Sequence, residues 1–308
     1  MPPRAEPAAL HLVHAQGKPR LLVAGASGKL GRRTAELLLQ AEAELILVTR
    51  TPAAVADLGD QGCEVRFGDY SEPDSLPDAF AGADSMLLIS ASDLEIRAEQ
   101  HRAAISAAAA VGVQHVVYTS ALNPEPPNPA VISPSHFATE QALAASGLAW
   151  TVLRDSLYSE YQVPEAAQSI ASGMLTHNRG EGQVAYVARE NCAAVAAAVL
   201  TGSGHEGRVY DVTGPELFTA RDLATLYGEL GGRDVQVEAL DDQTFVERLR
   251  RSADGDDDHA RYGAQLVASF GQSIREGYMS SRSDVVERLT QRPPRTLRAV
   301  LDDAGPFR

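Results

Sequence analysis

The sequence predicts an α/β fold in which a doubly wound parallel sheet carries helices on both faces. Two observations lead to this prediction. Short apolar segments alternate with helical patterns from residue 20 to residue 156, and such alternation favours parallel strands joined by right-handed crossovers. The first apolar segment also ends in a glycine-rich turn that leads into a helix, which is the way many such sheets begin.

Each element follows from its local pattern. Apolar runs bounded by turn residues predict strands, at 20–25, 44–50, 63–69, 84–90, 115–121 and 149–156. Helices are expected between them, at 29–40, 51–58, 75–80, 94–112 and 135–147. Thr51 has the character of an N-cap and Pro52 of a first helical residue. Residues 183–188 and 208–214 are expected to extend the sheet, with a helix at 191–200 between them.

The last third of the chain changes character and predicts a smaller, mainly helical region over 215–308, next to a sheet domain over 19–214. A helix at 218–232 opens with a capping box formed by Thr219 and Asp222. A short strand at 235–240, helices within 242–280, and two short helices within 283–305 that Pro293 and Pro294 separate complete the region. We interpret 1–18 as a flexible arm and the charge run 253–260 as a solvated loop.

Composition narrows the function classes. The net charge is −14 with 44% apolar and 22% charged residues, which argues against a nucleic-acid-binding surface because phosphates require concentrated lysine and arginine. No apolar run reaches the 18–20 residues that cross a membrane. The two cysteines, Cys63 and Cys192, are far apart and predict buried apolar residues in a cytoplasmic protein rather than a metal site or a disulfide.

The glycine-rich turn, AGASGKLG at 24–31, predicts a phosphate site. Gly25 allows a tight turn, Gly28 lets a phosphate approach the backbone, and Gly31 lets the helix pack on the strand. The free N–H groups and the dipole of the following helix favour an anion. We expect the pyrophosphate of a dinucleotide to be held by Gly25, Ser27, Gly28, Lys29, Leu30 and Gly31.

The end of the second strand predicts which dinucleotide binds. An NAD site usually has an acidic residue there for the ribose hydroxyls, but this strand ends Val48-Thr49-Arg50. Arg50 can donate a bidentate pair of hydrogen bonds to a 2′-phosphate, and Arg32 can add positive charge. The sequence therefore predicts NADPH rather than NADH.

Other strand ends belong to the same predicted site, since ligands lie at the carboxyl ends of parallel strands. Asp69 can meet the adenine amine, with Tyr70 next to it. Ser90 lies on the path from ribose to nicotinamide, and Thr119 and Ser120 are expected to line the nicotinamide.

Several segments together resemble a known group of proteins. They are GASGKLG, the TR that ends the second strand, FGDY, VGVQHVVYTSAL, HFATEQALAASGLAWTVLR, DSLYSEY and LTQRPPRTLRAVL. Over residues 20–302 the chain resembles the NmrA-like branch of the atypical short-chain dehydrogenases/reductases, and within it the NAD(P)H:quinone oxidoreductases and triphenylmethane reductases. The resemblance implies a Rossmann-like sheet, NADPH as cofactor, and a C-terminal region that binds the substrate.

One helix departs from the superfamily pattern. The superfamily's catalytic helix carries Tyr-x-x-x-Lys, whereas the matching residues here are His136 and Glu140. A quinone accepts hydride readily and needs mainly orientation in a dry pocket, so we expect reduction of a quinone or similar conjugated acceptor. His136 is a candidate for contacting the cofactor ribose or for donating a proton. Tyr158, with Tyr161 near it, is a candidate for walling the substrate pocket, and Tyr158 is with His136 a candidate catalytic residue.

Alternatives stay open at this point. Loss of Tyr-x-x-x-Lys also fits a non-catalytic NADP(H)-binding redox sensor of the NmrA type, and a tailoring reductase for a polyaromatic or enone substrate would share the chemistry. Five prolines make 123–135 stiff, and we interpret it as a lid or pocket rim. The expected partner is a small aromatic or quinone-like molecule, and the sequence leaves open whether the chain forms a homodimer.

Overall fold

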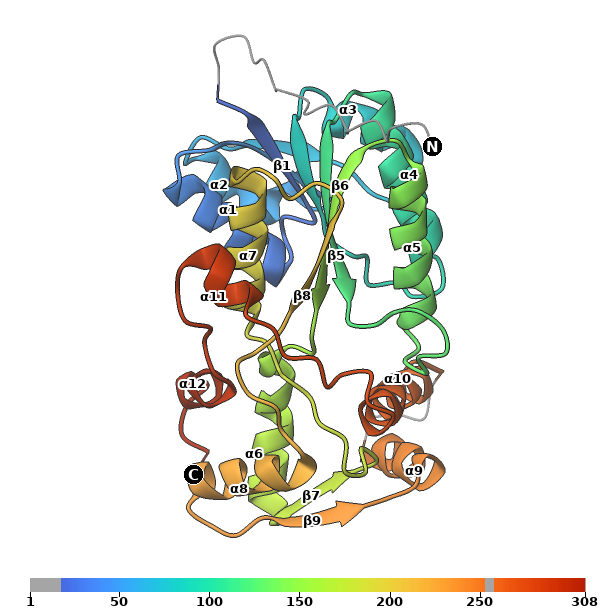
Figure 1. The fold of residues 1–308 in the computed structure, drawn as a ribbon, viewed down its shortest axis with the longest axis vertical. Helices are drawn as coiled ribbons and strands as arrows, with labels where there is room; N and C mark the ends of the chain where they lie inside the picture. Colours follow the sequence, from blue (N-terminus) through green and yellow to red (C-terminus); the bar gives the residue numbers. More distant parts are fainter. Residues whose placement is uncertain (1–17, 253–257, 308) are drawn as a thin grey trace, which may run out of the picture.

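The computed structural model describes residues 18–252 and 258–307, and in them it contains the predicted sheet of parallel strands (Figure 1). Within these residues the sheet has seven strands in the order β3-β2-β1-β4-β5-β6-β8. The chain therefore starts in the middle at β1, moves out to β3, returns to β4 and continues to β8. The strands are β1 (Arg20–Ala24), β2 (Glu44–Thr49), β3 (Glu64–Phe67), β4 (Ser85–Leu88), β5 (His115–Ala121), β6 (Ala149–Asp155) and β8 (Arg208–Val212).

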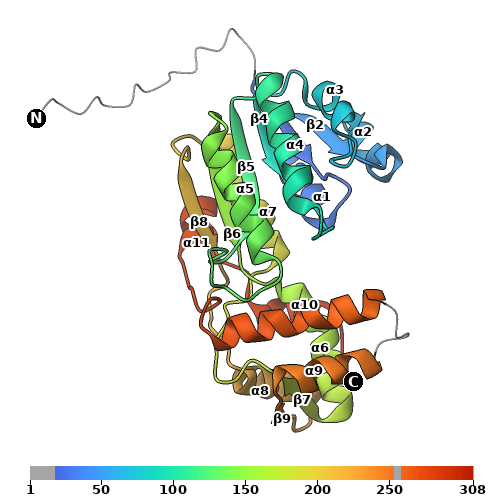
Figure 2. The same cartoon turned by 90° about the vertical axis from the view of Figure 1, so that its right-hand side faces the viewer.

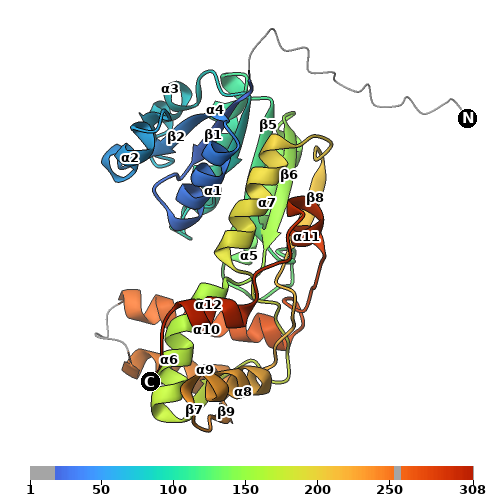
Figure 3. The same cartoon turned by 90° about the vertical axis from the view of Figure 1, so that its left-hand side faces the viewer.

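Helices cover both faces of the sheet. One face carries α1 (Lys29–Gln40), α2 (Ala56–Gly59), α7 (Arg189–Thr201) and α11 (Val285–Thr290) (Figure 3). The other carries α3 (Leu76–Phe80), α4 (Arg97–Ala110) and α5 (Ser133–Ala145) (Figure 2). The reversal between β1 and β4 leaves a crevice at the carboxyl ends of these strands, which is where ligands bind in open α/β sheets.

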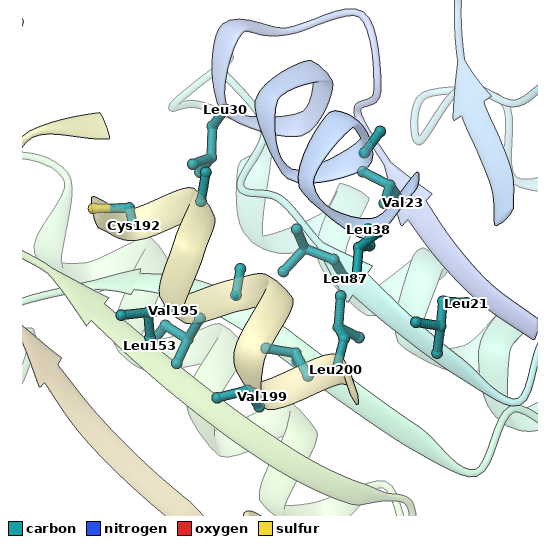
Figure 4. Packing of buried hydrophobic residues seen from close by; sticks show 14 of the residues in the cluster. Leu21, Val23, Leu30, Leu38, Leu87, Leu153, Cys192, Val195, Val199 and Leu200 are labelled. Atoms are coloured by element: carbon teal, nitrogen blue, oxygen red, sulfur yellow. The ribbon is translucent and has the colours of Figure 1, made fainter. Parts of the chain in front are cut away.

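Apolar packing fixes the first helix on the sheet. Leu30 and Leu38 of α1 lie in one buried cluster with Val195 and Val199 of α7 and with Leu153 of β6 (Figure 4). Each of these side chains is at most 5% exposed, and burying one stabilises the fold by about 1.5–3 kcal/mol. The N-terminus of α1 is thereby held rigidly at the crevice.

A second, smaller region lies beyond the carboxyl ends of the strands (Figures 1 and 2). It has its own buried cluster, and in the described residues its two strands pair in parallel. Its elements are α6 (Gln162–Ser172), β7 (Met174–His177), α8 (Ala220–Gly231), β9 (Gln236–Ala239), α9 (Asp242–Ser252), α10 (Asp258–Arg275) and α12 (Leu297–Asp303).

The two regions are not two continuous stretches of chain. Residues 162–177, which precede the last strand of the large sheet, pack with the C-terminal helices, whereas Val285 and Val286 of α11 pack back on the sheet. The sequence pattern did not assign α6 and β7. The capping box of Thr219 and Asp222 is confirmed, since each accepts a hydrogen bond from the other's main-chain N–H.

Two local predictions are wrong. Residues 183–188 do not extend the sheet: they make only isolated bridges, Tyr158 with Val187 and Val184 with Phe218. Residues 184–188 are buried, and an apolar run indicates burial without indicating a ladder of strand hydrogen bonds. Thr51 does not cap a helix with its side chain, and residues 52–55 form a 3₁₀ turn before α2.

Pro52 does open that turn, and Pro293 and Pro294 separate α11 from α12 as predicted. Residues 1–17 of the predicted arm and 253–257 of the predicted loop lie outside the described residues. Residues 258–260 belong to α10.

Candidate cofactor and substrate site

A cavity of about 840 Å³ lies between the carboxyl ends of the strands and the second region. Its lining includes eleven of the residues that the sequence predicted for the site. They are Gly25, Gly28, Lys29, Leu30, Gly31, Ser90, Thr119, Ser120, His136, Tyr158 and Tyr161. The fold therefore brings the glycine turn, two strand ends and the two predicted reactive side chains to one space.

The glycine turn has the geometry that a phosphate site needs. Gly25 has φ +87°, which is unfavourable for other residues, and its N–H donates to the Val48 oxygen at 2.9 Å. A Cβ on Gly31 would lie 2.4 Å from the Gly25 oxygen, so the helix can approach this closely only with glycine. The first N–H groups of α1 have no helical acceptor and point to the cavity end of the helix.

Space for a pyrophosphate is available at Gly28. An added Cβ there would meet one atom within 4 Å among the residues that the structure describes, the Gly25 oxygen at 3.3 Å. The Lys29 side chain beside it is exposed. Ser27 differs from its neighbours in the turn: its hydroxyl accepts a hydrogen bond from Thr49 at 2.7 Å, and it does not line the cavity.

Arg50 lies outside the cavity lining, at the open end of β2. Its side chain is exposed, and within the described residues it makes no hydrogen bond or ion pair. Arg32, by contrast, pairs with Asp57 and with Glu36. The charge of Arg32 is thus already balanced, and Arg50 is the arginine of the two that remains available for a phosphate.

Asp69 and Tyr70 also lie outside the cavity lining. The Asp69 carboxylate accepts a hydrogen bond from the Ser71 N–H at 2.8 Å, which is a local turn contact. The Tyr70 hydroxyl donates to the Ile89 oxygen at 3.5 Å. These two residues lie at the end of β3, and a role at the adenine stays a prediction.

His136 is the centre of a buried hydrogen-bonded chain. Its Nε2 lies 3.2 Å from the Arg97 guanidinium and its Nδ1 lies 2.8 Å from the Tyr118 hydroxyl. Arg97 can only donate, so Nε2 accepts, and the neutral ring carries its proton on Nδ1. Burial, strengthened by the Arg97 charge, lowers the pKa of His136 well below its usual range. Both ring nitrogens are therefore engaged, which favours a positioning role.

Arg97 is a site residue that sequence reasoning missed. It is 6% exposed, lines the cavity, and donates from Nε to the Ala91 oxygen at 2.6 Å. Its only sequence signal was its place at the start of a helix that follows a strand end, and many surface arginines share that place.

Glu140, at the lysine position of the superfamily pattern, is paired rather than free. Arg154 of β6 donates to both of its carboxylate oxygens, at 3.0 and 2.6 Å, and Ser120 donates to Oε1 at 2.6 Å. This pair joins α5 to the ends of β5 and β6. It supports the wall of the cavity, but it does not provide a proton donor.

Asp155 is a second residue that sequence reasoning missed. It is the last residue of β6, is 8% exposed, and lines the cavity. Its Oδ2 accepts a hydrogen bond from the Tyr158 hydroxyl at 3.1 Å. Burial raises the pKa of this carboxyl to about 7. An acidic residue at the end of a predicted strand was the available signal.

The second region supplies an apolar wall. Phe245, Met279 and the α10 residues Leu266, Val267, Phe270 and Ile274 line the cavity. The same wall contains a part-buried ion pair, Arg179 with Glu165. An aromatic or quinone-like molecule fits such a lining, because ring systems prefer apolar surroundings with few polar groups.

The proline-rich segment 123–135 is attached to the second region. Asn123 donates to the Tyr278 oxygen at 2.7 Å, and Ser273 donates to the Asn128 oxygen at 2.9 Å. Ile132 is part of the cavity lining. A lid or rim role for this segment stays a prediction.

Two other features are absent from the described residues. No cluster of three or more histidine, cysteine or acidic side chains there could hold a metal ion. None of the helices in these residues has the length and apolar character needed to pass through a membrane.

The model of a family described as NAD(P)H-binding matches residues 25–203. The chain belongs to this NAD(P)H-binding family. Quinone oxidoreductase 2 of Escherichia coli is 32% identical over 279 residues, which cover 90% of this chain and 96% of that protein. An NmrA-like family domain-containing oxidoreductase of Aspergillus flavus is 27% identical, with 89% of this chain and 91% of that protein covered.

Solved structures of two NAD(P)H-binding proteins superpose on this structure over nearly its whole chain. The E. coli NADPH-dependent quinone oxidoreductase complexed with NADPH superposes with a TM-score of 0.86 at 31% identity, covering 92% of this chain and 99% of that one. The triphenylmethane reductase of Citrobacter sp. complexed with NADP(H) gives 0.85 at 31%, covering 92% and 100%. The resemblance to the NmrA-like branch is confirmed, and with it the Rossmann-like fold.

Proposed function

We propose that the protein is an NADPH-dependent reductase that transfers hydride to a quinone or a similar conjugated acceptor. The observation that carries this proposal is the joining of a phosphate-binding turn and an apolar substrate wall in one cavity of about 840 Å³. The relatives named for NADPH-dependent quinone reduction and triphenylmethane reduction support the same reaction class.

The residues present fit the cofactor. The N–H groups at the start of α1 would hold the pyrophosphate, with Gly28 leaving the necessary space. Arg50 would hold the 2′-phosphate, and Ser90, Thr119 and Ser120 would line the nicotinamide end. When bound, the reduced nicotinamide supplies the hydride.

The chain's own contribution is orientation, exclusion of water and control of a proton. Arg97 and His136 form a fixed part of the cavity wall, since His136 contacts both Arg97 and Tyr118 and Arg97 also donates to the Ala91 oxygen. The α10 side chains would hold a flat acceptor against the cofactor. Tyr158 is part of the cavity lining, and its hydroxyl is the candidate group for contact with the oxygen that is reduced.

Turnover with a panel of acceptors tests this function. We expect the purified protein to oxidise NADPH with quinones, and more slowly with enones or cationic triphenylmethane dyes, as followed at the reduced-nicotinamide absorbance. Fast reduction of an enone with no quinone activity would favour a tailoring reductase. Tight NADPH binding without turnover of any acceptor would favour a redox sensor, and no binding at millimolar concentration would contradict the cofactor assignment.

Replacing Arg50 by alanine tests the choice of dinucleotide. We expect the Kd for NADPH to rise about 10–100-fold, which corresponds to the loss of one charge-assisted contact, while the Kd for NADH stays unchanged. Calorimetry of both cofactors measures this. Stability should not change, because the Arg50 side chain is exposed. Arg221→Ala, at another exposed arginine, is the control, and equal weakening of NADPH by both variants would contradict the assignment.

We also propose a cytoplasmic location, which the two buried free cysteines support, because thiols persist in reducing compartments. With the proposed function, the natural partner is a small aromatic or quinone-like molecule. The sequence leaves the oligomeric state open, with a homodimer as one alternative.

A further inference from the structure

Three features of the cavity carry titratable groups: the part-buried pair of Glu165 and Arg179, the chain through His136, and the carboxyl of Asp155. The geometry points to the last of them. We infer that Asp155 is the proton source of the reaction and passes its proton to the substrate through the Tyr158 hydroxyl. This inference rests on the proposed reductase function.

The surroundings of Asp155 are largely apolar. In the sheet its neighbours are Ala121 of β5 and Val212 of β8, both at most 6% exposed. On the face covered by α7, the Cys192 thiol lies near the carboxyl and lowers its pKa by less than burial raises it. The Oδ1 atom of Asp155 has no hydrogen-bond partner within the described residues. A buried carboxyl with an unpartnered oxygen favours the protonated form, because burial disfavours charge.

The charged groups nearby balance one another. The Arg189 guanidinium lies over the Tyr158 ring, 4.9 Å from its centroid, and Glu160 accepts from the Arg189 main-chain N–H at 3.0 Å and pairs with its side chain at 3.9 Å. Arg189 thus brings little net charge to Asp155. These contacts agree with the raised pKa of about 7 for the carboxyl.

The protonation state of Asp155 decides where the Tyr158 hydrogen points. An ionised carboxylate can only accept, so it retains the Tyr158 hydrogen on Oδ2, as the 3.1 Å contact allows. A neutral carboxyl instead donates its own O–H to the Tyr158 oxygen. The Tyr158 hydrogen is then free to turn toward the cavity, where both residues form part of the lining.

The proton balance of the reaction is complete with these two groups. Reduction of a quinone carbonyl consumes one hydride and leaves an oxyanion. The Tyr158 O–H bond breaks as a new O–H bond forms on the substrate oxygen, and the Asp155 O–H bond breaks as its proton restores the Tyr158 hydroxyl. Asp155 remains as a carboxylate and takes a proton from water before the next turnover.

His136 is a weaker candidate for this role. Its two nitrogens contact Arg97 and Tyr118, and its pKa lies well below neutrality through burial and the Arg97 charge. A neutral imidazole that already donates its single N–H has no proton to release near neutral pH.

The first test is the pH profile of turnover with a quinone. In the unaltered enzyme we expect kcat to fall as the pH rises through about 7, because ionised Asp155 withdraws the Tyr158 hydrogen. Asp155→Asn should remove this inflection and lower kcat at pH 6 by about 10–100-fold, at the low end of general-acid contributions. The Kd for NADPH should not change. A retained inflection in Asp155→Asn would overturn the inference.

The second test needs no turnover. Infrared difference spectroscopy of the cofactor-free protein should show a neutral carboxyl that ionises near pH 7, absent from Asp155→Asn.

Tyr158→Phe combines both tests. It should lower kcat as Asp155→Asn does, and it should move the ionisation of the carboxyl to higher pH, since the carboxylate loses its hydrogen-bond donor. Asp211→Asn is the matched control, because it alters a part-buried acid of β8 that does not line the cavity. Neither the pH profile of kcat nor the infrared ionisation near pH 7 should change in this variant.

These measurements distinguish a failure of the Asp155 inference from a failure of the proposed reductase function. A carboxyl that ionises near pH 4 would overturn the inference even if the protein reduces quinones. If the protein reduces no acceptor, the proposed function fails, and the infrared signal near pH 7 still decides whether Asp155 stores a proton.

Discussion

Gly31→Ala is expected to destabilise the fold and to abolish tight NADPH binding together. The added Cβ would lie 2.4 Å from the Gly25 oxygen, 2.9 Å from the Gly25 carbonyl carbon and 3.0 Å from the Ala26 Cα. All three are main-chain atoms, so no rotamer change can relieve the overlap. We expect the free energy of unfolding to fall by about 3 kcal/mol, at the upper end for overpacking, as measured by urea denaturation.

Gly28→Ala is the matched control in the same turn. Gly28 has φ −74° and ψ 157°, which any residue adopts, and its Cβ would lie 3.3 Å from the Gly25 oxygen. We expect stability to change by about 0.5 kcal/mol or less, while calorimetry shows NADPH binding weakened at least about tenfold. If Gly31→Ala leaves both stability and binding intact, close contact between α1 and the turn is not what positions the phosphate site.

These two glycines show why the cofactor half of the site was predictable. A tight turn, a close approach and a helix start are local requirements, and each leaves its mark on a few consecutive residues. The ranges of α1 and β5 match the predicted 29–40 and 115–121 for the same reason. The strand ends follow from topology, since parallel strands bring their carboxyl ends to one edge.

The substrate half was not predictable in this way. Asp155 carries no local signal of its burial: its environment comes from α7 and from two neighbouring strands. Arg97 and His136 meet across 39 positions of sequence. Glu165 belongs to α6 and Arg179 to the loop after β7, and the sequence pattern assigned neither α6 nor β7. Such contacts depend on how distant segments pack, whereas an apolar run such as 183–188 reports only that it is buried.

Glu165→Ala is expected to have the largest effect on stability in the second region. Glu165 and Arg179 have side chains that are 26% and 11% exposed, and Arg179 otherwise donates to the Tyr186 hydroxyl at 3.2 Å. Removal of the carboxylate leaves a buried guanidinium without its counter-charge. We expect the free energy of unfolding to fall by about 3–5 kcal/mol, as measured by urea denaturation.

The double variant Glu165→Leu/Arg179→Met separates the effect of the two charges on stability from the effect of the side-chain shapes. Replacing both charges by apolar groups of similar size removes the desolvation cost along with the attraction, so we expect its stability to return to within about 1 kcal/mol of the original chain. A double variant as unstable as Glu165→Ala would mean that the side-chain shapes, not the charges, matter here.

Because the pair is part of the cavity lining, the recovered double variant should also bind purely apolar acceptors better and lose preference among acceptors that differ by one polar group. The pair would then exchange some stability for selectivity, since a buried polar group rejects a ligand that leaves it unpaired.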